Sequence, residues 1–105
     1  MKFQNITILF IVTLFVFGCT ASQPLLEPDK DDLNQKAPAE FTVKLITTKG
    51  DILIDVQREH SPLAVDRFYY LVKNNYYSYN RFFRVLPGFV VQWGMKGVPQ
   101  IDSIW

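Results

Sequence analysis

Residues 82–92 read Phe-Phe-Arg-Val-Leu-Pro-Gly-Phe-Val-Val-Gln, and this stretch carries the clearest indication of fold and function. Arg84 lies between aromatic and aliphatic residues in a run that is otherwise typical of a buried strand. Pro87-Gly88 marks a turn, and the second apolar run ends on the polar amide of Gln92. Because a charge in an apolar setting is costly unless something requires it, Arg84 is the first candidate for a functional residue.

The chain before this stretch predicts a hairpin followed by a helix. Apolar and polar residues alternate over residues 41–57 on both sides of a turn at 48–50, which is the pattern of a β-hairpin. Ser61 is suited to cap a helix whose first residue is proline, and apolar residues at helical spacing extend that helix over residues 62–73. The expected order is therefore strand, strand, helix, strand, strand.

Composition excludes several classes of function. The chain has 105 residues, a formal net charge of +1 and a single cysteine. One domain is the most that this length holds, and no intrachain disulfide can form. There is no basic tract, no Cys/His spacing for a metal and no Gly-rich phosphate loop. We expect no nucleic-acid partner, no metal and no cofactor.

The N-terminus predicts a targeting segment over residues 1–18. Lys2 precedes an apolar run of signal-peptide length, shorter than the roughly 20 residues of a membrane-spanning helix. The run ends at Gly18-Cys19 and resembles the bacterial lipobox, although Phe17 is bulkier than the usual occupant. Cys19 is therefore the expected lipidation site. An ordinary cleaved signal peptide and an uncleaved anchor are the alternatives.

Residues 19–40 are rich in proline and acidic residues and contain no aromatic residue. Such a segment buries too little apolar surface to order itself, so we expect a disordered, lipid-anchored tether that holds the domain off a membrane. The expected location is the bacterial cell envelope, facing the periplasm. Thr20 is not the aspartate associated with inner-membrane retention, which favours the outer membrane.

The folded segment, residues 41–105, resembles the cyclophilins, which are peptidyl-prolyl cis-trans isomerases. The resemblance extends from Phe41 to about Gly94. It rests on the Thr-Lys-Gly-Asp-Ile hairpin, the Ser-Pro-Leu-Ala-Val-Asp-Arg-Phe helix start and the Phe-x-Arg-Val-Leu-Pro-Gly-Phe-Val-Val-Gln run. It implies activity on proline-containing polypeptides, without a cofactor, by a protein that is monomeric when full length.

The resemblance also implies roles for individual residues. Arg84 matches the catalytic arginine, and Gln92 matches a glutamine that hydrogen-bonds the substrate backbone. Phe89 matches an aromatic wall of the proline pocket, and Val90 falls where the family often has methionine in that pocket. Phe82 falls at an aromatic position below the site, where packing is the expected role.

The physics of the reaction fits an arginine. An X-Pro bond is held planar by amide resonance, with a barrier of about 18–20 kcal/mol. Twisting the bond returns a lone pair to the proline nitrogen, and a guanidinium placed there stabilises the twisted form more than the planar one. Since no bond breaks, the reaction needs neither a nucleophile nor a metal.

Other polar and aromatic residues have plainer interpretations. His60 is expected at the surface, and Asp66 and Arg67 on the exposed face of the helix. The tyrosines are expected to serve packing and turns; they are Tyr69, Tyr70, Tyr76, Tyr77 and Tyr79.

The sequence departs from the family pattern in two ways. Phe83 replaces a common histidine, and residues 93–95 read Trp-Gly-Met where many members have Gly-Gly-Asp. The implied fold is an eight-stranded antiparallel barrel capped by two helices. The expected structure is mainly β with one helix (α+β), the N-terminal half of that barrel. We expect such an incomplete barrel to be unstable and weakly active or inactive, because unpaired strand edges invite aggregation.

Three functions are compatible with these residues. The first is a membrane-tethered isomerase that assists folding of exported proteins. The second is a lipoprotein that binds proline-containing segments without catalysis, and the third is an inactive remnant. Arg84 favours the first, because a protein that only binds has no need of a charge placed on the amide.

Overall fold

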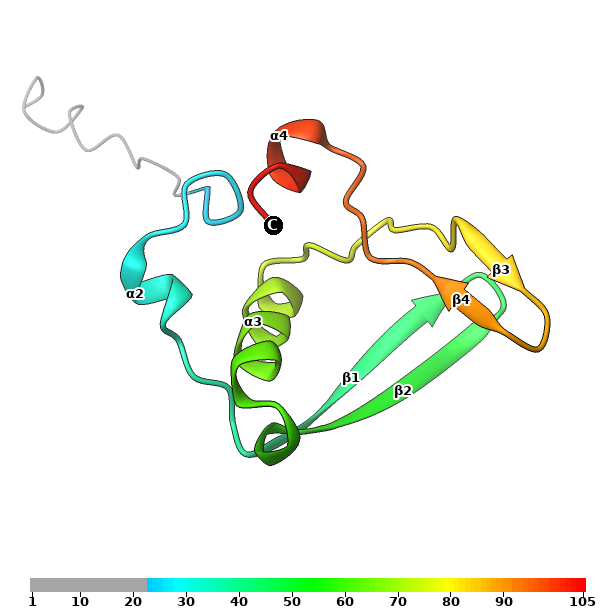
Figure 1. The fold of residues 1–105 in the computed structure, drawn as a ribbon, viewed down its shortest axis with the longest axis horizontal. Helices are drawn as coiled ribbons and strands as arrows, with labels where there is room; N and C mark the ends of the chain where they lie inside the picture. The colour runs from blue at the N-terminus through cyan, green and yellow to red at the C-terminus, as the bar shows by residue number, and fades with distance from the viewer. Residues whose placement is uncertain (1–22) are drawn as a thin grey trace, which may run out of the picture.

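The computed structural model describes residues 23–105, so the signal peptide predicted over residues 1–18 and the lipidation site Cys19 lie outside the described residues. Within residues 23–105, four strands pair as two antiparallel hairpins, and a central helix lies between the N-terminal and C-terminal segments (Figure 1).

The first hairpin has the predicted position. Strand β1 (Glu40–Thr47) pairs antiparallel with strand β2 (Gly50–Gln57), and a two-residue turn joins them. Val43, opposite Ile54, is buried, while the polar residues between the apolar ones face outward. The alternation in the sequence therefore gave the correct inner face of the hairpin.

The central helix also has the predicted bounds. A 3₁₀ turn, η1 (Arg58–His60), leads from β2 into helix α3 (Pro62–Lys73). Ser61 occupies the N-cap position, but its side chain makes no capping hydrogen bond there. Asn74 ends the helix, and its side-chain amide donates to the Tyr70 carbonyl at 2.9 Å.

The core lies on one side of α3. Its buried residues are Tyr70, Leu71 and Tyr76. Leu25 from the N-terminal segment and Ile101 and Trp105 from the C-terminal segment pack against this cluster, as does Tyr77 from the turn after α3. Burial raises the pKa of Tyr76, and the Asp102 carboxylate that accepts its hydroxyl hydrogen bond adds to the shift.

The segment from residue 23 to residue 37 differs from the predicted tether. It contains a short helix, α2 (Lys30–Leu33), and lies beside α3 (Figure 1). The Tyr70 hydroxyl donates to the Pro24 carbonyl at 2.9 Å, and the Trp105 indole donates to the Leu25 carbonyl at 2.8 Å. These long-range bonds hold the segment in an ordered conformation, which its composition did not predict.

Asp66 also differs from its predicted place on the exposed face of α3. Its carboxylate accepts two bonds from the Arg58 guanidinium, at 2.6 and 2.8 Å, and one from the Ala37 backbone N–H at 2.8 Å. The Asp66 side chain is only 15% exposed. One carboxylate thus joins η1, α3 and the N-terminal segment, and the bonds from Arg58, followed by that from Ala37, lower the pKa of Asp66 to about 2.

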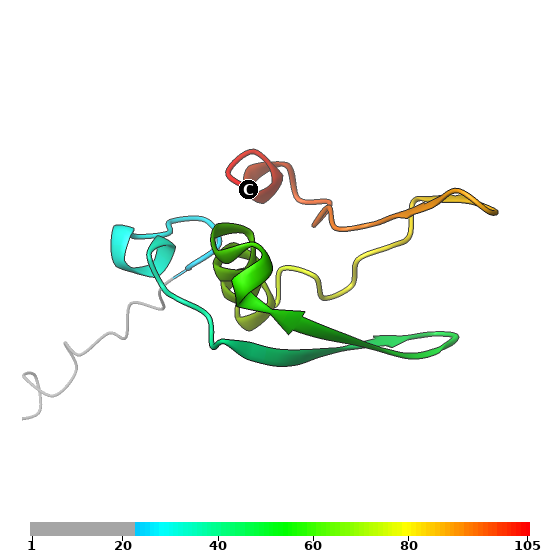
Figure 2. The same cartoon turned by 60° about the horizontal axis from the view of Figure 1, so that its bottom comes forward.

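The second hairpin is a separate sheet. Strands β3 (Arg84–Leu86) and β4 (Val90–Gln92) pair with each other but not with β1 or β2. Figure 2 shows the two hairpins as separate arms that extend from the side of α3.

A last short helix, α4 (Pro99–Asp102), follows the second hairpin. The antiparallel strands agree with the predicted fold class, whereas the expectation of a single helix was wrong, because α2 and α4 add two short ones.

The Arg58–Asp66 pair predicts a pH dependence of stability. Because the folded-state pKa of Asp66, about 2, lies below its ordinary value of 3.8, the pair stabilises the fold above about pH 4. That contribution is lost as the pH falls from about 4 towards 2. Urea unfolding of the Asp66→Asn variant should therefore show a weaker loss of stability over this range than the parent chain.

The matched control is Asp31→Asn in α2, which removes an exposed carboxylate. It should leave the pH dependence close to that of the parent chain. Equal losses of stability between pH 4 and pH 2 in the parent and Asp66→Asn chains would contradict the role given to this pair.

Candidate functional site

The β3–β4 hairpin brings Arg84 and Gln92 together. They are directly opposed in the strand register, as are Leu86 and Val90. Opposed residues lie on the same face of a sheet, so these four side chains share one face of the hairpin. The register follows from the Pro87-Gly88 turn, which the sequence predicted between the two apolar runs.

Arg84 is held by a hydrogen bond and remains accessible. Its Nη1 donates to the Gln92 Oε1 at 3.0 Å. Neither of the two ion pairs formed within residues 23–105 involves Arg84. A guanidinium carries five N–H donors, so the bond to Gln92 leaves further donors and the full charge open to an incoming oxygen or nitrogen. This arrangement suits the electrostatic stabilisation of a polarised amide.

The residues expected to form the proline pocket are on the same hairpin, but they do not enclose a cavity there. Phe89 is 79% exposed in the turn, and Val90 is half-buried at the start of β4. Several further apolar side chains of this hairpin and its approach are exposed; they are Phe82, Phe83, Val85, Leu86 and Val91. The hairpin thus presents one side of a site, with its apolar surface uncovered.

An aromatic cluster at the base of the hairpin joins it to α3. The Trp93 ring lies 5.1 Å from Tyr77 and 6.0 Å from Phe82, measured between ring centroids. Tyr77 in turn lies 5.5 Å from Phe68 of α3. Phe82, expected to pack below the site, therefore contacts Trp93. Sequence reasoning treated Trp93 only as a departure from the family pattern, although a large ring directly after Gln92 could have indicated a packing role.

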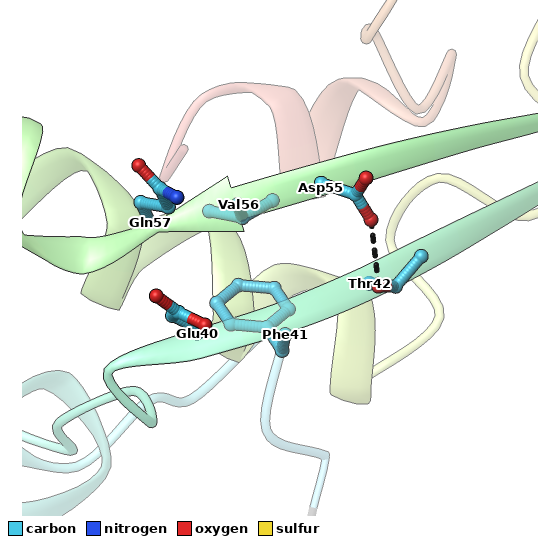
Figure 3. Close-up of a pocket in the computed structure, with 6 residues that line it drawn as sticks. All are labelled: Glu40, Phe41, Thr42, Asp55, Val56 and Gln57. Atoms are coloured by element: carbon cyan, nitrogen blue, oxygen red, sulfur yellow. Dashed lines mark hydrogen bonds between the residues drawn. The ribbon is translucent and has the colours of Figure 1, made fainter.

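A hollow occurs elsewhere, at the open end of the β1–β2 hairpin (Figure 3). Its lining residues are Glu40, Phe41, Thr42, Asp55, Val56 and Gln57. The Thr42 hydroxyl donates to an Asp55 carboxylate oxygen at 2.8 Å across it. None of the residues predicted from the sequence for a proline site lines this hollow, and its walls lack a cationic group.

The part of the chain that the structure describes contains no group of three or more His, Cys, Asp or Glu side chains placed to hold a metal ion. Over residues 23–105, no helix has the length and apolar character needed to cross a membrane. His60 is exposed and hydrogen-bonds Gln57, as expected for a surface residue.

Comparison with known proteins establishes the class. A sequence model of the family described as cyclophilin type peptidyl-prolyl cis-trans isomerase/CLD matches residues 42–102, which is more than half of the chain. The chain belongs to the cyclophilin-type peptidyl-prolyl isomerase family. No solved structure matched the fold.

Individual relatives agree with this assignment. The chain is 46% identical over 52 residues to peptidyl-prolyl cis-trans isomerase ppi1 of Schizosaccharomyces pombe, covering 50% of this chain and 34% of that protein. It is 42% identical over 55 residues to isomerase cypE of Dictyostelium discoideum, covering 52% of this chain and 35% of that protein. Peptidyl-prolyl isomerase CWC27 of Yarrowia lipolytica is 44% identical over 54 residues, covering 51% of this chain and 15% of that protein. The matched part thus spans about a third or less of these relatives.

The hairpin turn generates a stability prediction. Gly88 has a φ of +71°, a left-handed conformation that costs other L-residues about 1–2 kcal/mol. Gly88→Ala should open the turn and speed hydrogen exchange of the Phe89 N–H, which bonds the Leu86 carbonyl, by roughly 5- to 30-fold. Gly88→Asn should have a smaller effect, because asparagine tolerates this conformation. Unchanged exchange in Gly88→Ala would contradict the observed turn.

Proposed function

We propose that this protein is a peptidyl-prolyl cis-trans isomerase in which Arg84 stabilises the twisted prolyl amide. The observation that carries the proposal is the Arg84–Gln92 pair, with its hydrogen bond of 3.0 Å and its accessible guanidinium. Cyclophilins act on proline-containing polypeptides, and residues 42–102 match that family. The substrate we propose is accordingly an extended segment containing an X-Pro bond.

Arg84 and Gln92 have different roles in this proposal: Arg84 supplies the charge, and Gln92 aligns the substrate. The Gln92 side chain bonds the substrate backbone and holds the prolyl amide beside Arg84, while Phe89 and Val90 contact the ring. Arginine suits the charged role because it stays protonated and its donors have a fixed geometry. As the amide twists and the proline nitrogen gains electron density, the attraction to the guanidinium strengthens, which lowers the barrier.

Water exclusion decides how strongly the charge acts. In water the attraction between charges at 4 Å is about 1 kcal/mol, and it rises several-fold where the solvent is displaced. Phe89 is 79% exposed within the described residues, so the bound substrate itself must displace water from this face. We therefore expect weak but measurable activity from the 105-residue chain.

The alternatives from the sequence make different predictions for Arg84. A lipoprotein that binds proline-containing segments without catalysis would hold the peptide without accelerating its isomerisation. An inactive remnant would do neither. Neither alternative requires a guanidinium beside the position proposed for the substrate amide, whereas the isomerase proposal does.

The proposed location is the bacterial cell envelope. Cys19 would receive a lipid anchor. The protein would then assist the folding of exported proteins close to a membrane, on the periplasmic side. The lipobox-like Gly18-Cys19 sequence after a short apolar run supports this proposal.

Arginine replacement tests the enzymatic proposal. The Arg84→Ala chain should lose about 10²–10³-fold in kcat/KM on an X-Pro peptide in a protease-coupled assay, as expected when one electrostatic donor is removed. Arg81→Ala is the matched control, since Arg81 is an exposed arginine three residues away. Peptide binding without acceleration by the parent chain would favour the non-catalytic alternative, and loss of activity in both variants would remove the special role of Arg84.

A separate experiment tests the anchor. Expressed in a Gram-negative host, the chain should yield a mature protein that begins at a lipid-modified Cys19, detected by mass spectrometry, and Cys19→Ser should abolish the modification. Thr20→Asp should keep the lipid and shift the protein towards the inner membrane. An unmodified Cys19, or a mature start at another residue, contradicts the lipoprotein proposal.

A further inference from the structure

The strongest unexplained feature is the position of Trp93. It directly follows Gln92 at the end of β4, and its ring contacts Phe82, two residues before Arg84 in β3. The Phe82–Trp93 contact therefore joins the chain just before Arg84 to the chain just after Gln92, at the base of the hairpin. The two ring centroids are 6.0 Å apart in an edge-to-face arrangement, which aromatic pairs favour.

We propose that Trp93 is a positioning residue that fixes the Arg84–Gln92 pair relative to α3. The inference rests on the proposed isomerase function for its meaning in catalysis, but its geometry is independent of that function. Trp93 contacts Tyr77 at 5.1 Å, and Tyr77 contacts Phe68 of α3 at 5.5 Å. The aromatic series therefore connects the hairpin to the helix.

The segment that follows Trp93 is fixed by hydrogen bonds to the turn after α3 and to α4. Lys96 Nζ donates to the carbonyls of Asn75 and Ser78, at 3.0 and 3.1 Å, in the turn that follows α3. The Asp102 carboxylate accepts from the backbone N–H groups of Lys96 and Gly97, at 2.9 and 2.8 Å. These bonds hold the segment after Trp93 in place. The Trp93 ring is therefore fixed in position, and the hairpin packs against it.

Gly94 permits this arrangement. Its φ of +114° is one that residues with a side chain rarely adopt, and it lets the backbone turn immediately after Trp93. A Cβ at Gly94 would lie 3.7 Å from the Tyr77 Cε1, so the backbone passes close to the ring that Trp93 contacts. The Trp-Gly pair therefore works as one unit: the tryptophan supplies the contact and the glycine supplies the turn.

The alignment of Arg84 depends on this contact because β3 and β4 pair only with each other. A two-stranded hairpin is marginally stable in water unless it packs against another element. Without the Trp93 ring, we expect the hairpin to move relative to α3, and a displacement of about 1 Å can cost 10²-fold in rate. Substrate binding, which the exposed apolar residues share, should suffer less.

The first arm of the test does not depend on activity. In the Trp93→Ala chain, hydrogen exchange of the Phe83 N–H, which bonds the Gln92 carbonyl, should rise at least tenfold. The Asn74 N–H, which bonds the Tyr70 carbonyl at the end of α3, should be little changed. Trp93→Phe should keep the exchange of Phe83 close to that of the parent chain, since a phenyl ring can fill the same place.

The other tryptophan supplies the matched control. Trp105 packs on Tyr70 at 5.4 Å and bonds the Leu25 carbonyl, away from the hairpin. Trp105→Ala should therefore affect the core and the N-terminal segment without a selective effect on the Phe83 N–H. A rise in exchange that is equal at Phe83 and Asn74 in Trp93→Ala would mean that Trp93 supports the whole fold, and would overturn the proposal.

The second arm measures catalysis. Trp93→Ala should lower kcat/KM by about 10- to 100-fold, with most of the loss in kcat, and Trp93→Phe should restore most of it. A loss confined to KM would make Trp93 a binding residue and overturn the positioning role. If the parent chain is inactive, the isomerase proposal fails, while the exchange measurements still decide whether Trp93 fixes the hairpin.

Discussion

The packing of the Tyr77 ring between Phe68 and Trp93 is the contact on which the arrangement of the candidate site depends. Tyr77 lies 5.5 Å from Phe68 and 5.1 Å from Trp93, so a single side chain joins the helix to the base of the second hairpin. Burial raises the pKa of Tyr77, in keeping with a ring packed among other aromatic side chains. The neighbouring Tyr76 is part of the core itself. The position of Arg84 relative to α3 is thus set by aromatic packing, and the strand pairing sets its position relative to Gln92.

Arg84 is exposed to solvent, although the apolar residues around it in the sequence suggest a buried position. The apolar run around it indicates burial, and a buried, unpaired guanidinium would be costly. In the structure β3 is exposed, β4 is half-buried at Val90 and Gln92, and Arg84 bonds Gln92 while facing solvent. Under the proposed function, the cost of desolvating Arg84 would arise only when a substrate covers this face. Binding and catalysis would then be linked, because the attraction that strengthens in the twisted amide also requires water to leave.

Local patterns predicted the local structure well. The alternation around residues 48–50 gave the β1–β2 hairpin, and the helical spacing of apolar residues gave α3 over residues 62–73. Arg84 and Gln92 were selected from the family resemblance, and the sequence predicted a turn between them, but only the structure shows that they lie directly opposite each other. These features depend on residues close together in the chain, where periodicity and turn chemistry are informative.

Contacts between distant residues could not be predicted in this way. The Tyr70 hydroxyl bonds a carbonyl 46 positions earlier, and the Trp105 indole bonds one 80 positions earlier, so composition alone presented residues 23–37 as a free tether. Asp66 was expected in solvent because helical periodicity does not reveal that Arg58 lies across the preceding turn. The role of Trp93 was missed for the same reason, since its partners Tyr77 and Phe82 come from other elements.

The central claim is that the Arg84–Gln92 face binds a prolyl amide, and side-chain NMR tests it most directly. The full chain, labelled with ¹⁵N, is titrated with a short X-Pro peptide and, separately, with the same peptide carrying alanine in place of proline. The account predicts that the Arg84 Nε–Hε and Gln92 side-chain amide signals shift with the prolyl peptide and move far less with the alanine peptide. Equal shifts with both peptides, or shifts confined to residues such as Glu40 and Gln57 at the hollow of the first hairpin, would contradict it.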